Sequence, residues 1–150
     1  LTEEDKEYLS ELKLVRQVRD FTIVHATLDT PSGWGYVTNK FDALASFGYQ
    51  YTPLCFFGHT HLPVFYSKTS SVEVEDGQTI EIETGKRYFA NIGSVGQPRD
   101  GDPRASYCIY DMGGQRMVNR RVEYDLKTTQ QKIRDAGLPG MLGDRLELGK

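Results

Sequence analysis

The sequence is poor in cysteine, and its two cysteines are not spaced as a pair. Cys55 and Cys108 lie far apart in separate apolar runs, and no Cys-x-x-Cys occurs. This placement predicts two buried free thiols of the kind found in reducing compartments. We therefore expect a cytoplasmic protein.

Positive charge and long apolar runs are also scarce. The 18 Lys and Arg residues are outnumbered by 21 Asp and Glu residues, for a net charge of −3. A surface that coats DNA or RNA needs an excess of basic residues, so this class of function is excluded. No apolar run approaches the ~20 residues that span a bilayer, and no signal peptide is recognisable near the start, so we expect no membrane association.

What the chain does have is enough apolar sequence for one folded domain. Its 150 residues are 38% hydrophobic and 26% charged, which is the composition of a globular protein rather than a disordered one. The length allows one domain with a sizeable core and leaves little for a second. We expect a single α/β domain over residues 1–150, parallel in its first part and antiparallel in its middle.

The first part of the chain has the pattern of a βαβ unit. Residues 21–26 are apolar and β-branched without polar alternation, which predicts a strand covered on both faces, and residues 54–57 repeat that pattern. Between them, Thr38 is predicted to cap a helix that Gly48 ends. The predicted buried face of this helix carries Phe41, Leu44 and Ala45. Strand, helix and strand in this order predict two parallel strands.

Beyond Pro63 the pattern becomes antiparallel. Residues 72–75 and 79–83 alternate between apolar and polar, and Asp-Gly at 76–77 lies near the turn between them, which predicts a β-hairpin. A further strand is expected at 87–92. A strand pair is expected at 105–111 and 117–124, around Gly113-Gly114.

Helices are expected at both ends of the chain. Thr2 is placed to cap a helix with acidic residues in its first turn. Asp125 is placed to cap another, which Gly137 ends. The tail from Pro139 is expected to be a short helical segment at most.

The three histidines of the chain all fall near the ends of the predicted parallel strands. His25 lies at the end of the first strand, and His59 and His61 follow the second across Gly58. The carboxyl ends of parallel strands share one edge, where ligands of open α/β sheets gather. Surface or hydrogen-bonded histidines are the alternative, but this convergence predicts a metal site. Spacing alone does not identify a reaction.

Several segments resemble the calcineurin-like metallophosphoesterases. The sequence FGHTH at 57–61, followed by Leu-Pro, resembles the Gly-His-x-His motif that closes their metal site, and VHAT at 24–27 resembles an upstream histidine motif. Residues 91–107 resemble a loop and strand of the small bacterial branch of that family, and residues 124–139 are similar to its C-terminal helix. The resemblance covers nearly the whole chain, with the motifs in the family's order.

The resemblance implies a metal-dependent phosphoesterase that acts on phosphomonoesters or phosphodiesters of small molecules or phosphoproteins. It implies a partial metallophosphoesterase sandwich with two divalent ions, such as Mn, Fe, Zn or Ni. His25 and His59 would bind one ion and His61 the other. A hydroxide that bridges the ions would attack phosphorus in line. The resemblance assigns no catalytic acid or base to this chain.

The family's upstream motifs are missing from the sequence. No Asp-x-His or Gly-Asn-His occurs, and Gly-Asp occurs only at 101–102 and 143–144, after the Gly-His-x-His. The chain resembles the C-terminal portion of the family's fold, and its start at Leu1 fits a cut between motifs. Because the bridging carboxylate is absent, we expect weak metal binding at best and no turnover by this chain alone. We also expect self-association or pairing with a missing N-terminal half.

Other residues carry open alternatives. Arg99 and Arg104 flank a Gly/Pro/Asp-rich loop and are candidates to bind substrate phosphate, unless they pair with Asp100 and Asp102. Trp34 and Tyr36 form either a lid over substrate or an aromatic plug on the core. Asn91 and Ser94 orient substrate or a metal-binding histidine, or else make turn hydrogen bonds.

Two further functions compete with a phosphoesterase half. The chain is alternatively a truncated, non-enzymatic binding or regulatory module that retains a partial metal site. It is alternatively one part of a split enzyme whose first half is a separate chain. The DNA upstream of the codon for Leu1 discriminates between these, because it either continues into the missing motifs or does not.

Overall fold

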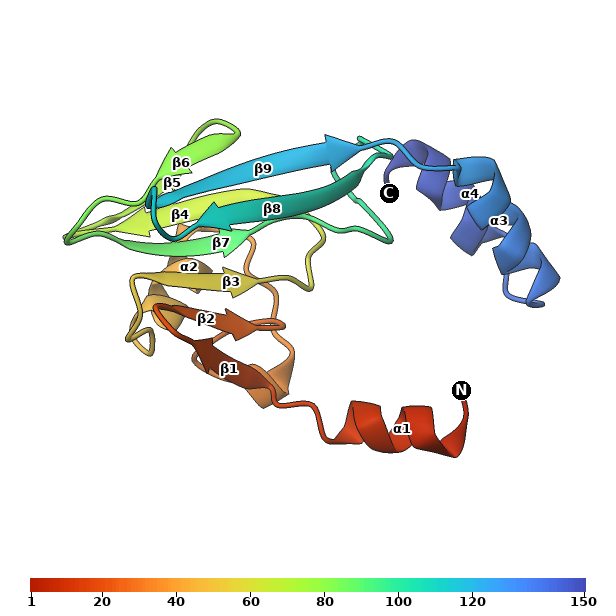
Figure 1. Ribbon diagram of the computed structural model, residues 1–150, viewed down its shortest axis with the longest axis horizontal. Helices are drawn as coiled ribbons and strands as arrows, with labels where there is room; N and C mark the ends of the chain where they lie inside the picture. Colours follow the sequence, from red (N-terminus) through yellow and green to blue (C-terminus); the bar gives the residue numbers. More distant parts are fainter.

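A six-stranded mixed sheet forms the centre of the protein. The computed structural model describes residues 1–150 (Figure 1). The strand order is β1 (Val15–Val18), β2 (Phe21–Val24), β3 (Leu54–Phe57), β7 (Arg87–Asn91), β4 (Val64–Lys68) and β5 (Val72–Glu75). Strands β2, β3 and β7 are parallel, and β1, β4 and β5 are antiparallel to their neighbours. The predicted βαβ unit is thus confirmed, with its strands as direct neighbours and their carboxyl ends at one edge.

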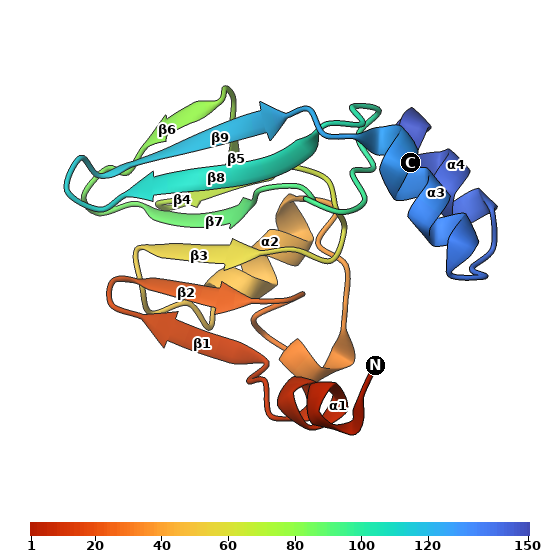
Figure 2. The same cartoon turned by 45° about the vertical axis from the view of Figure 1, so that its right-hand side comes forward.

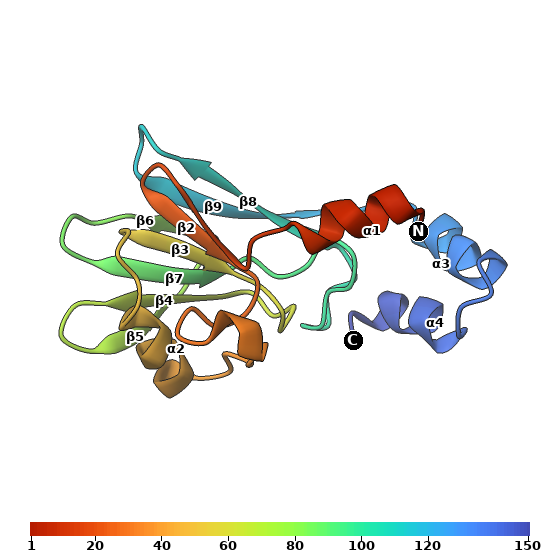
Figure 3. The same ribbon diagram turned by 90° about the horizontal axis from the view of Figure 1, so that it is seen from below.

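Two further layers cover this sheet on opposite faces (Figure 3). One is helix α2 (Lys40–Phe47), which packs over Val24, Phe57 and Phe89. The other is a three-stranded antiparallel sheet with the order β6 (Thr79–Glu81), β9 (Arg116–Val122) and β8 (Ala105–Asp111). Met117 is fully buried between the two sheets, next to Leu54 and Ala90. The α/β fold class with an antiparallel second part is therefore confirmed.

The predicted hairpin across Asp76-Gly77 is wrong. Strand β5 pairs with β4 in the large sheet, whereas β6 pairs with β9 in the small one. The turn carries the chain from one sheet to the other, because Val72 faces the α2 core whereas Ile80 faces the core between the sheets. Strands β1 and β4 were not among the predicted elements. Their short runs of mixed polarity lack a distinct period-2 pattern.

Helix α2 buries a different face from the predicted one. Ala43, Ser46 and Phe47 are fully buried, whereas Phe41 is 83% exposed and Leu44 is 47% exposed. The cap is Asn39, whose side chain accepts hydrogen bonds from the amides of Phe41 and Asp42, and not Thr38. Thr38 instead donates to the Asp42 carboxylate. Positions 41, 44 and 45 and positions 43, 46 and 47 both have helical spacing, and packing against β4, β5 and β7 selects the second set.

The remaining helices stand away from the sheets. Helix α1 (Glu3–Ser10) begins at Thr2 with a reciprocal capping box, as predicted, yet buries none of its residues. A short 3₁₀ helix, η1 (Pro31–Gly33), follows β2. Helices α3 (Leu126–Asp135) and α4 (Met141–Leu148) form a hairpin at the end of the sheets where β2, β3 and β7 finish (Figures 1 and 2). Helix α4 has two turns, more than the tail was expected to form.

No helix has the length and apolar character needed to cross a membrane. Both cysteines are free, as predicted. Cys55 is fully buried, but Cys108 is only partly buried. Burial raises the pKa of the Cys55 thiol to about 12, so it stays protonated at neutral pH.

The face of the large sheet opposite α2 is only partly covered. The small sheet lies over β3, β7 and β4, and Ile23 on β2 is left 44% exposed, which corrects the expectation of a strand buried on both faces. A cavity of about 1180 Å³ opens above this region. Its lining includes Leu9, Leu14, Val15, Ile23, Phe56 and Trp34. This surface is an open, mainly apolar hollow, and His25 lies on its wall.

Candidate functional site

His25 and His59 meet at the carboxyl edge of the parallel strands. His25 directly follows β2 and His59 follows β3 by two residues, and the Gly58 amide donates to the His25 carbonyl, which joins the two strand ends. Nε2 of His25 lies 3.1 Å from Nδ1 of His59. Two nitrogens bound ~2.0–2.1 Å from one ion lie roughly 2.9–3.4 Å apart at ligand angles of about 90–110°. In the metal-free protein these two nitrogens share a hydrogen bond, and their spacing equals that of two ligand positions on one metal ion, which would replace the shared proton.

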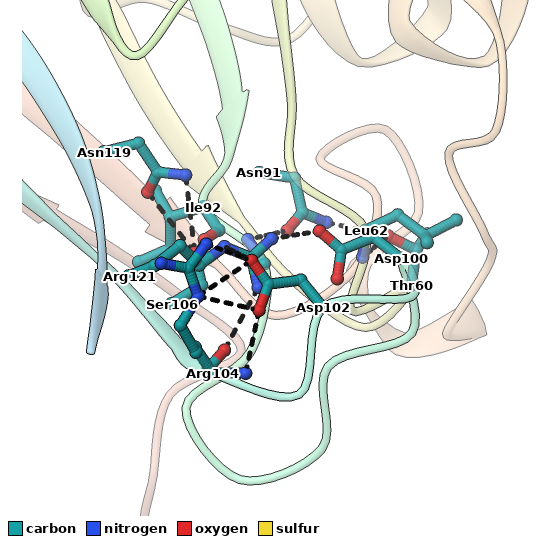
Figure 4. Close-up of polar contacts among 11 residues, drawn as sticks. Thr60, Leu62, Asn91, Ile92, Asp100, Asp102, Arg104, Ser106, Asn119 and Arg121 are labelled. Atoms are coloured by element: carbon teal, nitrogen blue, oxygen red, sulfur yellow. Dashed lines mark hydrogen bonds and ion pairs between the residues drawn. The ribbon is translucent and has the colours of Figure 1, made fainter. Parts of the chain in front are cut away.

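The turn that carries His59 is strained and held from below. The Thr60 amide donates to the Gly58 carbonyl at 2.8 Å, which closes a three-residue turn around His59 at φ +68°. Such a turn with a positive central φ is rare and strained. The buried Asn91, at the end of β7, stabilises it by donating to the Gly58 carbonyl at 2.9 Å. It also donates to Oγ1 of Thr60 at 2.9 Å (Figure 4). Asn91 thus makes turn hydrogen bonds and orients a histidine at the same time.

His61 points to a different partner. Its Nδ1 lies 2.7 Å from the carbonyl oxygen of Gln97. A carbonyl only accepts, so Nδ1 carries the proton and Nε2 keeps its lone pair. Such a carbonyl partner is the usual outer contact of a metal-binding histidine. No group of three or more His, Cys, Asp or Glu side chains is arranged to hold one ion, so the histidines provide a pair and a separate third ring.

The electrostatic surroundings favour neutral imidazoles. Burial lowers the pKa of His25, and the charges that His59 and His61 would carry lower it further. Burial also lowers the pKa of His61. The Gln97 carbonyl opposes that effect, whereas the positive charges of Arg99 and Arg145 add to it. A neutral ring is the form that binds a metal ion.

Two exposed aromatic rings pack against the histidine pair. Tyr36 stacks on His59 with ring centroids 4.4 Å apart and planes at 29°. Trp34, at φ +52°, lies 4.8 Å from His25, centroid to centroid. Both aromatic residues are at least half exposed. They are not a plug on the core, because each is exposed and covers one side of a histidine ring; a lid over substrate stays a prediction.

The two candidate phosphate-binding arginines differ in availability. Arg99 donates twice to the Oε1 atom of the neutral Gln97, at 3.3 and 2.9 Å. Arg104 instead forms a two-pronged ion pair with Asp102, whose pKa falls to about 2 because of that hydrogen bonding (Figure 4). Pairing with an aspartate of the loop is thus observed for Arg104 and not for Arg99.

Two residues at this edge were not found from the sequence. Arg121 on β9 has a side chain only 12% exposed and forms an ion pair with Asp100 from beneath the loop (Figure 4). Arg121 lies two residues after the buried Asn119 on the same strand, so the two side chains share a face, and this alternation is the sequence signal that could have found it. Arg145 on α4 lies close enough to His61 to affect its pKa. No sequence signal relates Arg145 to the histidines, because the hairpin geometry alone brings it there.

The sequence and the fold of the chain are similar to those of other proteins. No protein-family model matches the chain. The chain is 40% identical over 126 residues to an uncharacterized protein of Methanocaldococcus jannaschii, a match that covers 84% of this chain and 50% of the relative. A crystal structure of a metallophosphoesterase from Sphaerobacter thermophilus has 40% identity and a TM-score of 0.88, over 100% of this chain and 63% of that one.

A more distant structure supports the fold alone. The crystal structure of a hypothetical protein from Pyrococcus horikoshii has 17% identity and a TM-score of 0.73, over 98% of this chain and 55% of that one. The chain thus spans about half of the curated relative and less than two thirds of either solved structure.

Proposed function

The chain has a calcineurin-like metallophosphoesterase-related fold, and from this premise we propose that it is part of a metal-dependent enzyme that hydrolyses phosphate esters. The observation that carries the proposal is the His25–His59 pair, whose ring nitrogens lie 3.1 Å apart at the carboxyl edge of parallel strands. That spacing suits one ion. The substrates are phosphomonoesters or phosphodiesters of a small molecule or a phosphoprotein.

Each histidine has a distinct role in the proposal. Nε2 of His25 and Nδ1 of His59 bind the first of two divalent ions, and Nε2 of His61 binds the second. Imidazole nitrogen suits Mn, Fe, Zn or Ni. Cations held there would supply Lewis acidity toward a phosphoryl oxygen. Tyr36 and Asn91 fix the ring and the turn of His59, and the Gln97 carbonyl fixes the ring of His61.

Arg99 is the stronger candidate for contact with the substrate phosphate. Its guanidinium is bound only to a neutral amide, so its charge is free to attract an anion. Arg104 remains a candidate, but Asp102 neutralises it at 2.6 Å. Arg145 adds positive charge on the His61 side of the site, because it lowers the pKa of His61 as Arg99 does.

The site needs carboxylates that this chain does not place near the histidines. The relatives are longer than the chain, and the hollow beside His25 is open and apolar. We therefore propose that a further segment, on the same or a separate chain, covers that hollow and supplies the missing ligands. The alternative, a non-enzymatic module with a partial metal site, is favoured by the absence of any three-ligand group.

The test uses the chain alone and the chain co-expressed with the part of the S. thermophilus relative outside the matched region. Both are stripped with EDTA, reloaded with Mn²⁺, and assayed on p-nitrophenyl phosphate and bis(p-nitrophenyl) phosphate. We expect no turnover by the chain alone and turnover by the complex that is lost with His59→Ala. Turnover by the chain alone that depends on His59 would contradict the need for the missing ligands. A metal-loaded but inactive complex would favour the module.

A further inference from the structure

The α3–α4 hairpin is attached to the rest of the molecule in an unusual way. The two helices pack on each other, through a hydrogen bond from Gln130 to the Gly143 carbonyl and an Arg134–Asp144 ion pair. Apart from packing on each other, α3 and α4 do not pack extensively against any strand or against α1 or α2. The hairpin stands clear of both sheets (Figure 2). Neither helix contributes to the two apolar clusters of the sheets, and the hairpin's hydrogen bond to the rest of the molecule lies at the end of α4.

That contact joins the end of α4 to the loop after β7. The Gly101 amide donates to the Gly149 carbonyl at 3.0 Å. Gly149 has φ +61°, and a Cβ atom there would lie 2.8 Å from both the Asp102 amide nitrogen and the Gly101 carbonyl carbon. Backbone meets backbone so closely that only glycine fits without moving the loop.

The same loop holds His61 from its other end. The Arg99 amide donates to the His61 carbonyl at 3.3 Å, and the Gln97 carbonyl accepts from Nδ1 of His61 at 2.7 Å. From beneath, Arg121 forms ion pairs with Asp100 and Asp102 and donates to the Arg104 carbonyl (Figure 4). The loop is thus fixed by β9 on one side, by Gly149 on another, and in turn fixes the His61 ring.

We propose that the α3–α4 hairpin is a brace for His61, and that Gly149 is a positioning residue that holds loop 97–104 so that the Gln97 carbonyl keeps the proton of His61 on Nδ1. Apart from its bonds to His61, loss of the Gly149 contact leaves the loop attached only through Arg121, so the Gln97 carbonyl moves relative to His61 and the proton then exchanges between the two ring nitrogens. The effect of the brace on metal binding rests on the proposed function. The effect on the His61 ring does not.

The chain offers a matched control in the same hairpin. Gly137 also has a positive φ, +70°, but an added Cβ there would meet no atom within 4 Å. Gly149→Ala and Gly137→Ala therefore impose similar backbone strain, and only the former collides with the loop. Gly149→Asn adds a second variant, because asparagine tolerates the left-handed conformation but still places its side chain against the loop.

The readouts are long-range ¹H–¹⁵N spectra of the His61 ring and amide hydrogen exchange, both in EDTA-treated protein. We expect Gly149→Ala and Gly149→Asn to move the His61 ring nitrogens toward averaged shifts and to speed exchange at the Gly101 amide by about tenfold or more. Gly137→Ala leaves both unchanged. Exchange in β3 and β7 stays as in the wild type, because the hairpin does not pack on them.

Unchanged His61 ring signals in both Gly149 variants would overturn the proposal. Equal changes in Gly137→Ala would also overturn it, because the hairpin as a whole would then act rather than its contact with the loop. A Zn²⁺ titration of the same samples separates the two proposals. The titration therefore includes the complex with the covering segment: if that complex binds no Zn²⁺ while the His61 signature still depends on Gly149, the metal assignment fails and the brace stands.

Discussion

Three residues near the histidine pair have the left-handed backbone conformation without being glycine. Trp34, His59 and His61 have φ of +52°, +68° and +61°, a conformation that costs roughly 1–2 kcal/mol per residue. Each places an aromatic or imidazole ring at the sheet edge. The positions of the histidines could be predicted from strand order, but the backbone angles of His59 and His61 could not, because both turns are held by hydrogen bonds from distant parts of the chain, at Asn91 and at residues 97–99.

Asn91→Ala is expected to destabilise the protein by about 2–4 kcal/mol, since it removes hydrogen bonds to the buried Thr60 hydroxyl and to the partly buried backbone of Gly58 and Gly93. Urea unfolding measures the change. Asn39→Ala, which removes the α2 cap, is the control and costs only about 1 kcal/mol. Equal losses in the two variants would show that Asn91 has no special role in the turn of His59.

The metal-free protein is expected to lose stability as pH falls below about 6.5. The pKa of His25 is lowered in the folded state, so the unfolded chain binds the proton first and unfolding is favoured as pH drops through the ordinary histidine range. Because His25 is an exposed residue, the change is small. Denaturant unfolding in EDTA between pH 7.5 and 5 measures it, and His25→Gln is expected to reduce the slope. An unchanged slope would contradict the lowered pKa.

Among the secondary-structure elements, strands with strong local signals were predictable and their partners were not. The apolar runs at 21–24 and 54–57 identified β2 and β3 as parallel neighbours. The Asp76-Gly77 turn also lies where it was expected, but β5 and β6 pair with β4 and β9 instead of with each other. Burial against the distant Met117 decides the partner of β6, and local alternation contains no information about that contact.

The buried face of α2 can be tested with two phenylalanines of the same helix. Phe47→Ala is expected to cost about 3–5 kcal/mol, because Phe47 is fully buried against Phe89. Phe41→Ala is expected to change stability by less than about 0.5 kcal/mol, because Phe41 is 83% exposed. Thermal or urea unfolding of both variants measures the difference. Comparable losses of stability in the two variants would contradict the observed buried face and favour the face that the sequence pattern predicted.

At the scale of the whole molecule, the apolar hollow beside the candidate site is the surface feature that calls for a partner. Its wall combines Ile23 and Phe56 of the sheet with Leu9, Leu12 and Leu14 from α1 and the segment after it. A hollow of this kind marks an interaction surface. The sequence could predict an incomplete site from its missing motifs, but it could not show which face is left open.

Without a covering segment, the chain is expected to self-associate through this hollow. Ile23→Lys places a charge in the hollow and should lower the apparent mass at high protein concentration in sedimentation or light-scattering measurements. Phe41→Lys is the matched control, because Phe41 is an exposed apolar residue on the other side of the sheet. Association that Phe41→Lys reduces and Ile23→Lys does not would assign the contact to the α2 side.

The crossing of the chain between sheets at residues 76–78 also sets an order of events during synthesis. The large sheet is complete once Asn91 has left the ribosome, because β7 is its last strand. Strand β6, already made, has no partner until Thr79 and Ile80 can meet Val118 and Met117. From Asn91 to Val118 is 27 residues, so at roughly 5–20 residues per second this interval lasts about 1–5 seconds. During it the nascent chain presents one finished layer and one unpaired strand, which is the period when a chaperone would engage it.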